Sequence, residues 1–223
     1  MKKYLFALLF ILTVLVTGSC PVIRNVQAAV VQEDQVNKLI WFGDSRTVFF
    51  GETVYGYKPK KGVYPATILR RHVVARRTSM CGWANGTGYK ELSKRLKKHP
   101  DAIVIFNFGV NDIGRGYDHR GSYRKLINKI HRKFPQVQLY FMSVNPVRAS
   151  SGNPYAKNSY KARQVNQRIA AFNSYIKKHL PKGYGYINTY KKVKFRYKDG
   201  LHYTNRTYKD IAYYVTGRKK LGK

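Results

Sequence analysis

Short apolar runs alternate along this chain with stretches whose apolar residues recur at helical spacing. The apolar runs cover residues 38–42, 72–79, 102–108, 138–143 and 185–188, and the helical patterns cover 89–98, 122–134, 161–179 and 207–215. Strands that alternate with helices through short loops form parallel sheets that are covered on both faces. The chain is therefore predicted to be an α/β protein, a three-layer α/β/α sandwich around a parallel sheet of about five strands.

Three polar motifs follow these elements at positions where function is expected. Gly43-Asp44-Ser45 comes directly after the first run, Gly109-Val110-Asn111-Asp112 follows the run 102–108, and Asp199-Gly200-Leu201-His202 precedes the last helical pattern. Each motif alone is also ordinary cap or turn chemistry. Functional groups of parallel sheets gather at the carboxyl ends of the strands, so the three motifs are expected to meet there.

In this order, the motifs resemble the GDS, GxND and DxxH blocks of the SGNH (GDSL-like) hydrolase superfamily, and the resemblance spans about residues 37–216. The GDSRT form of the first block, the turn 143–147 (SVNPV) and the ending 199–204 (DGLHYT) are similar to an exported bacterial branch of that superfamily. The resemblance implies a flavodoxin-like sheet, ester hydrolysis by a serine nucleophile and no cofactor.

The chemistry of ester cleavage explains the residue types. A serine hydroxyl needs an adjacent base to become nucleophilic, and His202 is suited to accept its proton near neutral pH. Asp199, three residues earlier, is placed to orient the imidazole and to stabilise its charged form. Ser45, His202 and Asp199 are therefore the candidate catalytic residues. His119, next to Asp118, is the alternative base.

The family resemblance also implies an oxyanion hole, which is a set of donors for the tetrahedral intermediate. Its members would be the backbone N–H of Ser45, the N–H of a glycine in the second block, and the side-chain amide of Asn111. Gly86 is the preferred glycine because Leu92 of the next helix then falls at the usual distance, and Gly88 is the second choice. No metal-ligand spacing or phosphate-binding loop is found in the sequence.

Two further residues are candidates for substrate binding. Arg46 replaces the leucine of the GDSL pattern and is predicted to face the cleft, where a guanidinium suits carboxylate or phosphate recognition. The alternatives are a salt bridge to a nearby acid or a solvated position. Asn145, which precedes Pro146 after the run 138–143, is predicted to line the site, with a turn-forming role as the alternative.

Residues 1–29 have the pattern of a signal peptide or N-terminal anchor, followed by one SGNH hydrolase domain at 30–223. Lys2 and Lys3 precede the apolar run from Tyr4 to Val16, which is shorter than the about 20 residues of a membrane span. Cleavage near Ala28 is favoured over a lipobox-like site at Gly18-Ser19-Cys20, and an uncleaved anchor is the third option. Each option places the domain outside the cytoplasm, at the cell surface or free.

The formal net charge is +33, from 43 Lys and Arg against 10 Asp and Glu. Such a chain is attracted to polyanions, and for an exported protein the anionic cell wall or membrane surface is a better partner than nucleic acid. The leading hypothesis is a secreted O-acetyl esterase that acts on cell-wall or other polysaccharide. The alternatives are a cell-surface polyanion-binding protein whose catalysis is lost or incidental, and an O-acyltransferase.

Overall fold

The computed structural model describes residues 30–222 of the chain. The predictions about a leader at 1–29 lie outside the described residues. Within the described range, no helix combines the length and the apolar character that are needed to cross a bilayer.

One six-stranded sheet forms the centre of the molecule, with strand order β2-β3-β1-β4-β5-β6. The five strands β3, β1, β4, β5 and β6 are parallel to one another, whereas β2 pairs antiparallel with β3 at the edge. The strands are β1 (Leu39–Gly43), β2 (Thr67–Arg70), β3 (Val73–Arg76), β4 (Ile103–Asn107), β5 (Gln138–Met142) and β6 (Gly185–Ile187). The predicted α/β class and parallel core are confirmed, and the sheet differs from the prediction by its antiparallel edge strand.

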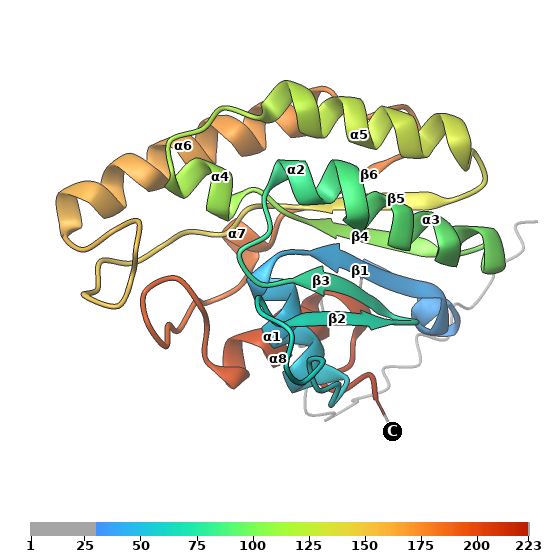
Figure 1. Cartoon of the computed structure of the whole chain (residues 1–223), viewed down its shortest axis with the longest axis horizontal. Coiled ribbons are helices and arrows are strands. Elements are labelled where there is room, and N and C mark those ends of the chain that lie inside the picture. Colours follow the sequence, from blue (N-terminus) through green and yellow to red (C-terminus); the bar gives the residue numbers. More distant parts are fainter. Residues whose placement is uncertain (1–29, 223) are drawn as a thin grey trace, which may run out of the picture.

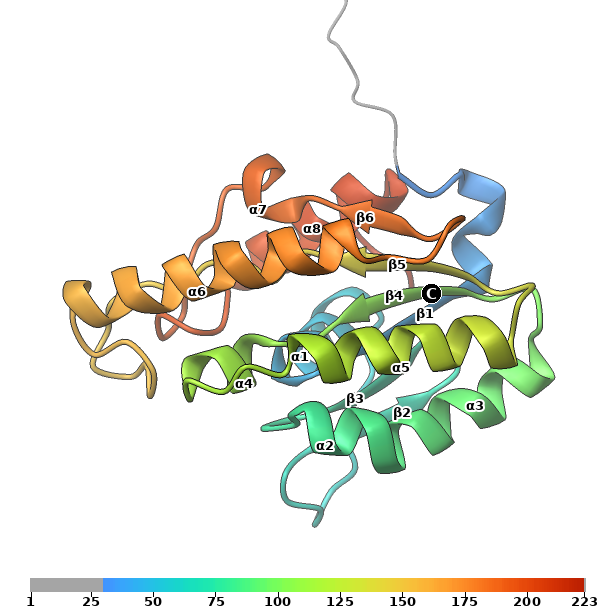
Figure 2. The same cartoon turned by 90° about the horizontal axis from the view of Figure 1, so that it is seen from above.

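Helices cover both faces of this sheet (Figure 1). They are η1 (Glu33–Lys38), α1 (Ser45–Val54), α2 (Cys81–Trp83), η2 (Ala84–Gly88), α3 (Tyr89–Lys98), α4 (Val110–Gly114), α5 (Arg120–Lys133), α6 (Ser159–Lys178), α7 (Thr189–Lys192) and α8 (Asn205–Thr216). All four predicted helical patterns form helices, namely α3, α5, α6 and α8. Figure 2 shows α5 and α6 running across the sheet from above.

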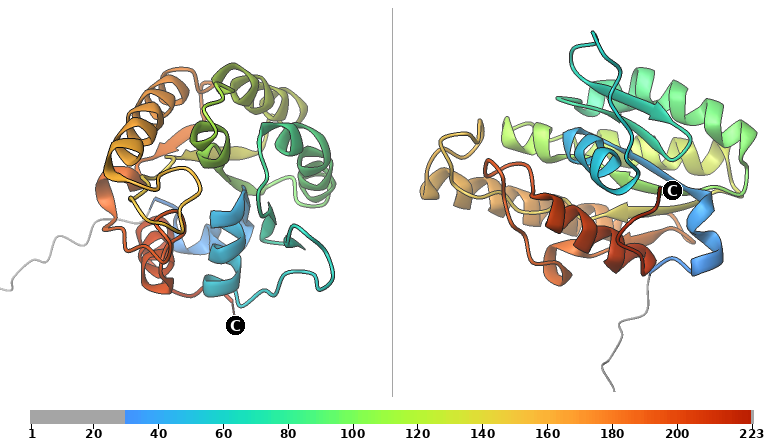
Figure 3. Two further views of the ribbon diagram at one scale, coloured as in Figure 1. Left: turned by 60° about the vertical axis from the view of Figure 1, so that its left-hand side comes forward. Right: turned by 90° about the horizontal axis from the view of Figure 1, so that it is seen from below.

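The side-chain alternation of the strands divides the core into two clusters. In β1, Leu39 and Trp41 pack against α1 and α8, whereas Ile40 and Phe42 pack toward α3, α5 and α6. Successive residues of a strand point to opposite faces, so a strand buried on both sides is apolar along most of its length. Figure 3 shows the resulting helical layers on opposite sides of the sheet, which is the predicted three-layer sandwich.

The edge strand β2 escaped prediction for a physical reason. Its residues read Thr-Ile-Leu-Arg, and only Ile68 is buried, while Leu69 is 41% exposed. A short edge strand has one hydrogen-bonded neighbour and one covered face, so its sequence lacks the continuous apolar run of a central strand.

Candidate active site

Three helices begin at the carboxyl edge of the parallel strands. α1 follows β1, α2 follows β3 after a short loop, and α4 follows β4. The first turn of a helix has backbone N–H groups without an intrahelical acceptor, and it favours negative charge. This edge of the sheet therefore presents several donors to one region, and the three sequence motifs lie there.

The Gly43-Asp44-Ser45 motif is a strand-to-helix turn. Gly43 ends β1, and a Cβ at this position would lie 1.9 Å from Thr47 Oγ1 and 2.5 Å from the Asn107 carbonyl oxygen, so only glycine fits. The Asp44 side chain caps α1 by accepting a hydrogen bond from the Arg46 backbone N–H at 3.0 Å. Ser45 is the first residue of α1, and this turn fixes where its hydroxyl points.

The structure brings Ser45, His202 and Asp199 together in one hydrogen-bonded chain. Ser45 Oγ lies 3.0 Å from His202 Nε2, and His202 Nδ1 lies 2.7 Å from Asp199 Oδ2. The other oxygen of Asp199 accepts the backbone N–H groups of Leu201 at 2.9 Å and His202 at 2.6 Å. The carboxylate therefore shapes its own loop while it orients the imidazole.

The local environment tunes both members of the Asp199–His202 pair. Burial would raise the pKa of Asp199, but the hydrogen bonds from the His202 ring and from two backbone N–H groups outweigh it, so the pKa lies below its usual value. Burial lowers the pKa of His202, and the Asp199 contact offsets this only in part. At neutral pH the imidazole is therefore uncharged and able to accept a proton.

Asn111 and Asp112 link the GxND block to the loop after β3. Asn111 Nδ2 donates to the Ser79 carbonyl at 2.8 Å, and Asn111 is 3% exposed. Asp112 accepts the Cys81 backbone N–H at 3.2 Å and the Tyr123 hydroxyl at 2.6 Å. Asp112 thus organises the loop, and the Asn111 amide retains a second hydrogen besides the one given to Ser79.

A further glycine of this segment, Gly82, lies beside the residue that Asp112 holds. Gly82 follows Cys81 in the first turn of α2, immediately after the residue that Asp112 holds. Gly86 and Gly88 lie further along in η2, and a Cβ on Gly88 would come within 2.7 Å of the Trp83 ring, so this glycine makes room for packing. Gly86 and Gly88 stay predictions, and Gly82 is a third candidate.

The expectation that Arg46 faces the cleft needs correction. Arg46 is 3% exposed, and its guanidinium stacks over the Tyr203 ring at 4.6 Å from the centroid. It donates to the carbonyl oxygens of Leu201 at 3.1 Å, Asn145 at 2.7 Å and Pro146 at 3.0 Å. The side chain is thus neither a substrate ligand nor a surface residue, because three backbone acceptors occupy its donors. It fastens α1, which begins at Ser45, to the loop that carries His202.

Asn145 is likewise placed in a structural role. It is 2% exposed, and its side-chain oxygen accepts the hydroxyls of Thr189 at 2.7 Å and Ser143 at 3.2 Å. The predicted position lining the site is therefore corrected to the turn-forming alternative, since the buried amide organises the chain between β5 and α7.

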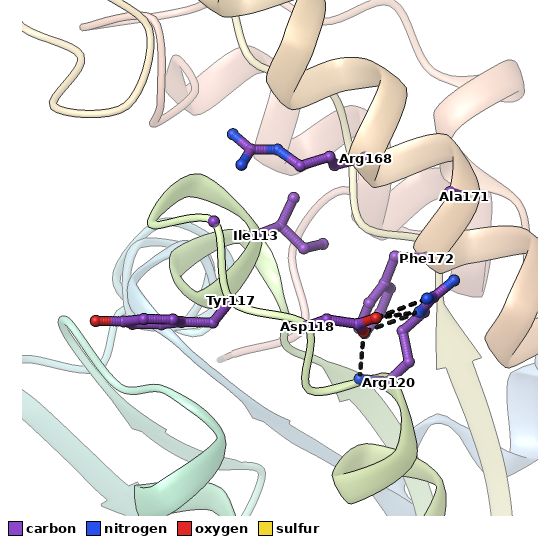
Figure 4. A pocket seen from close by; sticks show the side chains of 8 residues that line it. Ile113, Tyr117, Asp118, Arg120, Arg168, Ala171 and Phe172 are labelled. Carbon is purple, nitrogen blue, oxygen red and sulfur yellow. Dashed lines mark hydrogen bonds and ion pairs between the residues drawn. The ribbon is translucent and has the colours of Figure 1, made fainter.

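The thiol of Cys81 and the alternative base His119 have other contacts in the structure. Burial, aided by the charge of Asp112, raises the pKa of the Cys81 thiol to about 11, so it stays protonated at neutral pH. His119 Nε2 lies 3.6 Å from Asp112 Oδ1, on the α4–α5 side of the site. Its neighbour Asp118 is ion-paired with Arg120, as Figure 4 shows.

A pocket of about 170 Å³ lies beside this loop, between α4 and α6, and Figure 4 shows the side chains that line it. Ile113 and Phe172 give it an apolar wall, and Arg168 extends across it. The pocket is lined by none of Ser45, Asp199 and His202. Among residues 30–222, no group of three or more His, Cys, Asp or Glu side chains is arranged to hold a metal ion.

Several solved structures share the fold at low sequence identity. A protein named as a platelet activating factor from Streptococcus pneumonia matches with a TM-score of 0.54 and 15% identity over 86% of each chain. A GDSL-like lipase from Bacteroides thetaiotaomicron matches with 0.54 and 15% identity, over 82% of this chain and 88% of its own. An acetyl esterase mutant with an acetate ion matches with 0.50 and 13% identity, over 84% and 95%.

Sequence comparison gives the family. No curated protein sequence matches the chain significantly. The family model described as the GDSL-like Lipase/Acylhydrolase family matches residues 41–209, a range that includes Ser45, Asn111, Asp199 and His202. The chain therefore belongs to the GDSL-like lipase/acylhydrolase family.

Proposed function

We propose that this acylhydrolase is a serine esterase in which Ser45 is the nucleophile, His202 the general base and Asp199 the residue that orients His202. The observation that carries the proposal is the chain of contacts from Ser45 Oγ to His202 Nε2 at 3.0 Å and from His202 Nδ1 to Asp199 Oδ2 at 2.7 Å. These distances are those of a serine that is activated by a hydrogen-bonded base.

In the proposed reaction, Ser45 Oγ attacks the ester carbonyl carbon as its proton passes to His202 Nε2. The tetrahedral intermediate collapses, the alcohol leaves with the proton from His202, and the acyl group stays on Ser45. Water, deprotonated by His202, then attacks the acyl-enzyme and releases the acid. The same residues would perform acyl transfer if another alcohol replaced that water.

The proposed oxyanion donors are the N–H of Ser45, the second amide hydrogen of Asn111 and the N–H of Gly82. Ser45 and Gly82 are in the first turns of α1 and α2, and Asn111 is in the first turn of α4. Backbone N–H groups of a first helical turn have no intrahelical acceptor, and negative charge is favoured there. Gly82 replaces Gly86 in this proposal.

We propose a short acyl group, acetyl in particular, and an ester carried by an anionic polymer outside the cell. An acetyl esterase is among the structural neighbours, and that likeness supports the fold on which the proposal builds. The leader pattern of residues 1–29 supports export, and the net charge of +33 favours an anionic partner. The sequence contains no extended apolar insertion of the kind that a lipase lid uses.

The position of Arg77 near His202 favours the proposal that the substrate is anionic. Its guanidinium lies 4.4 Å from the centroid of the Phe49 ring, and that ring lies 4.7 Å from the His202 ring. The charges of Arg46 and Arg77 both lower the pKa of His202, and Arg77 is also paired with Glu52 at 3.5 Å, which reduces its share. A negative group on the substrate would offset this effect, so the arrangement suits an acidic ester better than a neutral one.

The first test is hydrolysis of p-nitrophenyl acetate and butyrate by the purified protein and by Ser45→Ala and His202→Ala. Activity is expected to fall at least about 10⁴-fold in both variants and to be unchanged in Ser174→Ala, an exposed serine on α6. The rate should decline on acidification through a pKa below 6.5, because burial lowers the pKa of His202. Equal rates for the wild type and Ser45→Ala would refute the esterase proposal.

A polyanion-binding protein is the second candidate, and the net charge of +33 is the observation that favours it. Salt-sensitive binding to a polyanion such as polyphosphate, retained in Ser45→Ala, would be expected for this function. Binding of that kind in a protein without esterase activity would identify it as the main role.

A further inference from the structure

An asparagine that donates to an oxyanion must have its amide held in one orientation. The amide oxygen and the amide nitrogen are similar in shape, and a half-turn of the terminal torsion exchanges them. Only the nitrogen end stabilises a developing negative charge, whereas the oxygen end would repel it. The surroundings of Asn111 therefore decide whether this residue helps or hinders catalysis.

Two contacts hold both ends of the Asn111 amide. Nδ2 donates to the Ser79 carbonyl at 2.8 Å, and Oδ1 accepts the Tyr155 hydroxyl at 3.0 Å. A carbonyl oxygen only accepts, so Ser79 selects the nitrogen end and uses one of its two hydrogens. The hydroxyl of Tyr155 donates to the buried oxygen end. The second hydrogen of Nδ2 has no protein acceptor in these two contacts.

Tyr155 is itself fixed by packing and by the backbone. Its ring lies against Gly114 of α4, where an added Cβ would come within 2.4 Å of the ring carbons. Burial raises the pKa of Tyr155, partly offset by Arg115, so the hydroxyl keeps its proton at neutral pH and remains a donor. The ring and the hydroxyl are therefore both held toward the GxND helix.

The same segment reaches the other side of the site. The Tyr155 backbone N–H donates to Asn153 Oδ1 at 2.9 Å, and Asn153 Nδ2 donates to the Gly200 carbonyl at 3.1 Å and the Arg148 carbonyl at 3.0 Å. Asn153 is fully buried. The stretch 148–156 thus ties the loop of Asp199 and His202 to Asn111 through a continuous series of hydrogen bonds.

We propose that Tyr155 is a positioning residue of this site, whose hydroxyl locks the Asn111 amide with Nδ2 directed at the oxyanion. The proposal rests on the esterase function proposed above. Donation to Oδ1 also draws electron density from the amide and makes the remaining N–H a stronger donor. Tyr155 acts through Asn111 and touches no reacting atom.

The test is Tyr155→Phe, which removes the hydroxyl and keeps the ring against Gly114. For p-nitrophenyl acetate, kcat is expected to fall about tenfold with KM unchanged, since one hydrogen bond to a transition-state donor is lost. Affinity for an aryl trifluoromethyl ketone, which forms an oxyanion on Ser45, is expected to fall by the same factor. Tyr160→Phe, at an exposed tyrosine of α6, is the matched control and should change neither value.

A double-mutant comparison separates positioning from a general structural role. In the Asn111→Ala background, Tyr155→Phe is expected to have no further effect on kcat, because its target is gone. A tenfold loss in both backgrounds, or an unchanged kcat in Tyr155→Phe, would overturn the proposal.

An activity-independent measurement keeps the proposal testable if the esterase function fails. The side-chain amide NMR signals of Asn111, identified by their loss in Asn111→Ala, should shift in Tyr155→Phe and stay in place in Tyr160→Phe. Unchanged signals in Tyr155→Phe would overturn the positioning role. Failure of the esterase proposal shows itself separately, as equal hydrolysis by the wild type and Ser45→Ala.

Discussion

The two sides of the site are fastened by opposite charges. On the side of Ser45 and His202, the buried cation of Arg46 collects the backbone carbonyls of Leu201, Asn145 and Pro146. On the side of Asn111, the buried anion of Asp112 collects the Cys81 backbone N–H and the Tyr123 hydroxyl.

In both cases one charged side chain draws loops that are distant in sequence onto the carboxyl edge of the sheet. Hydrogen bonds with a charged partner are stronger than neutral ones, and the buried charge is destabilised when any of them is lost. The difference lies in what each charge holds. The Arg46 cation holds α1, which begins at Ser45, beside the loop of His202, and the Asp112 carboxylate holds the start of α2 beside Asn111. Substitutions on the first side are therefore expected to impair the activation of Ser45, and substitutions on the second side to impair the stabilisation of the oxyanion.

The largest effect is expected from the triad side, at Asp199. Asp199→Asn keeps the shape of the side chain but no longer favours the His202 tautomer whose Nε2 accepts a proton, so kcat for p-nitrophenyl acetate should fall about 10⁴-fold. Asp210→Asn, in a surface pair with Arg196, is the control and should keep full activity. A loss below tenfold would mean that Asp199 does not orient the base.

The oxyanion side is expected to contribute less. Asn111→Ala should lower kcat about 10²–10³-fold and leave KM nearly unchanged, because the lost donor acts in the transition state. Steady-state kinetics on the same ester measure both values. An increase in KM alone would place Asn111 in ground-state binding and would remove the contrast between the two sides.

The role of Arg46 should appear in stability. Arg46→Ala leaves the carbonyls of Leu201, Asn145 and Pro146 without their donor. Each buried group left without a partner costs about 1–3 kcal/mol, so the free energy of unfolding measured by urea titration should fall by at least about 3 kcal/mol. The stability of Arg46→Lys should lie between those of the wild type and Arg46→Ala, because an ammonium does not reproduce the planar guanidinium. A change below about 0.5 kcal/mol, the range of ordinary surface substitutions, would show that this side is held by other contacts.

The smallest effect concerns pH and the cap of α1. Burial raises the pKa of Asp44 from 3.8 to about 7, although Arg46 and the capping N–H act against it. Between these values the folded chain holds a proton that the unfolded chain has released, so this residue reduces stability as the pH rises from about 4 to 7.

Asp44→Asn keeps an oxygen that accepts the capping N–H and removes the titration. Relative to the wild type, the variant should therefore gain on the order of 2 kcal/mol in the free energy of unfolding between pH 5 and pH 8. Urea titrations at the two pH values measure this difference. An equal effect of the substitution at both would show that Asp44 is ionised throughout.

The central elements could be predicted because burial on both faces leaves a direct trace in sequence. β4 is buried at every residue, and the α6 stripe of Val165, Ile169, Phe172 and Ile176 is buried against the sheet. The edge strand β2 leaves no such trace. The motif order likewise predicted that Ser45, His202 and Asp199 meet, since strand ends share one edge of a parallel sheet.

The wrong predictions at Arg46 and Asn145 have a common cause. The partners of Arg46 are backbone carbonyls, up to 155 residues away in the chain, and carbonyls carry no sequence signal. From the sequence alone, an arginine next to Ser45 is expected to bind substrate. The loop after β3 is similar, since its attachment runs through the Cys81 N–H and the Ser79 carbonyl rather than through side chains.

Arg46 also has an evolutionary consequence. A leucine at this position cannot bind carbonyl groups, so a relative with the GDSL form of the motif must close the turn at 145–146 and the loop at 201 by other means. Residue 46 and these two loops are therefore expected to change together between lineages, with arginine accompanied by the Asn-Pro turn. An arginine introduced alone into a relative with leucine at this position would enter a site without acceptors. The unpaired buried charge would then destabilise the fold.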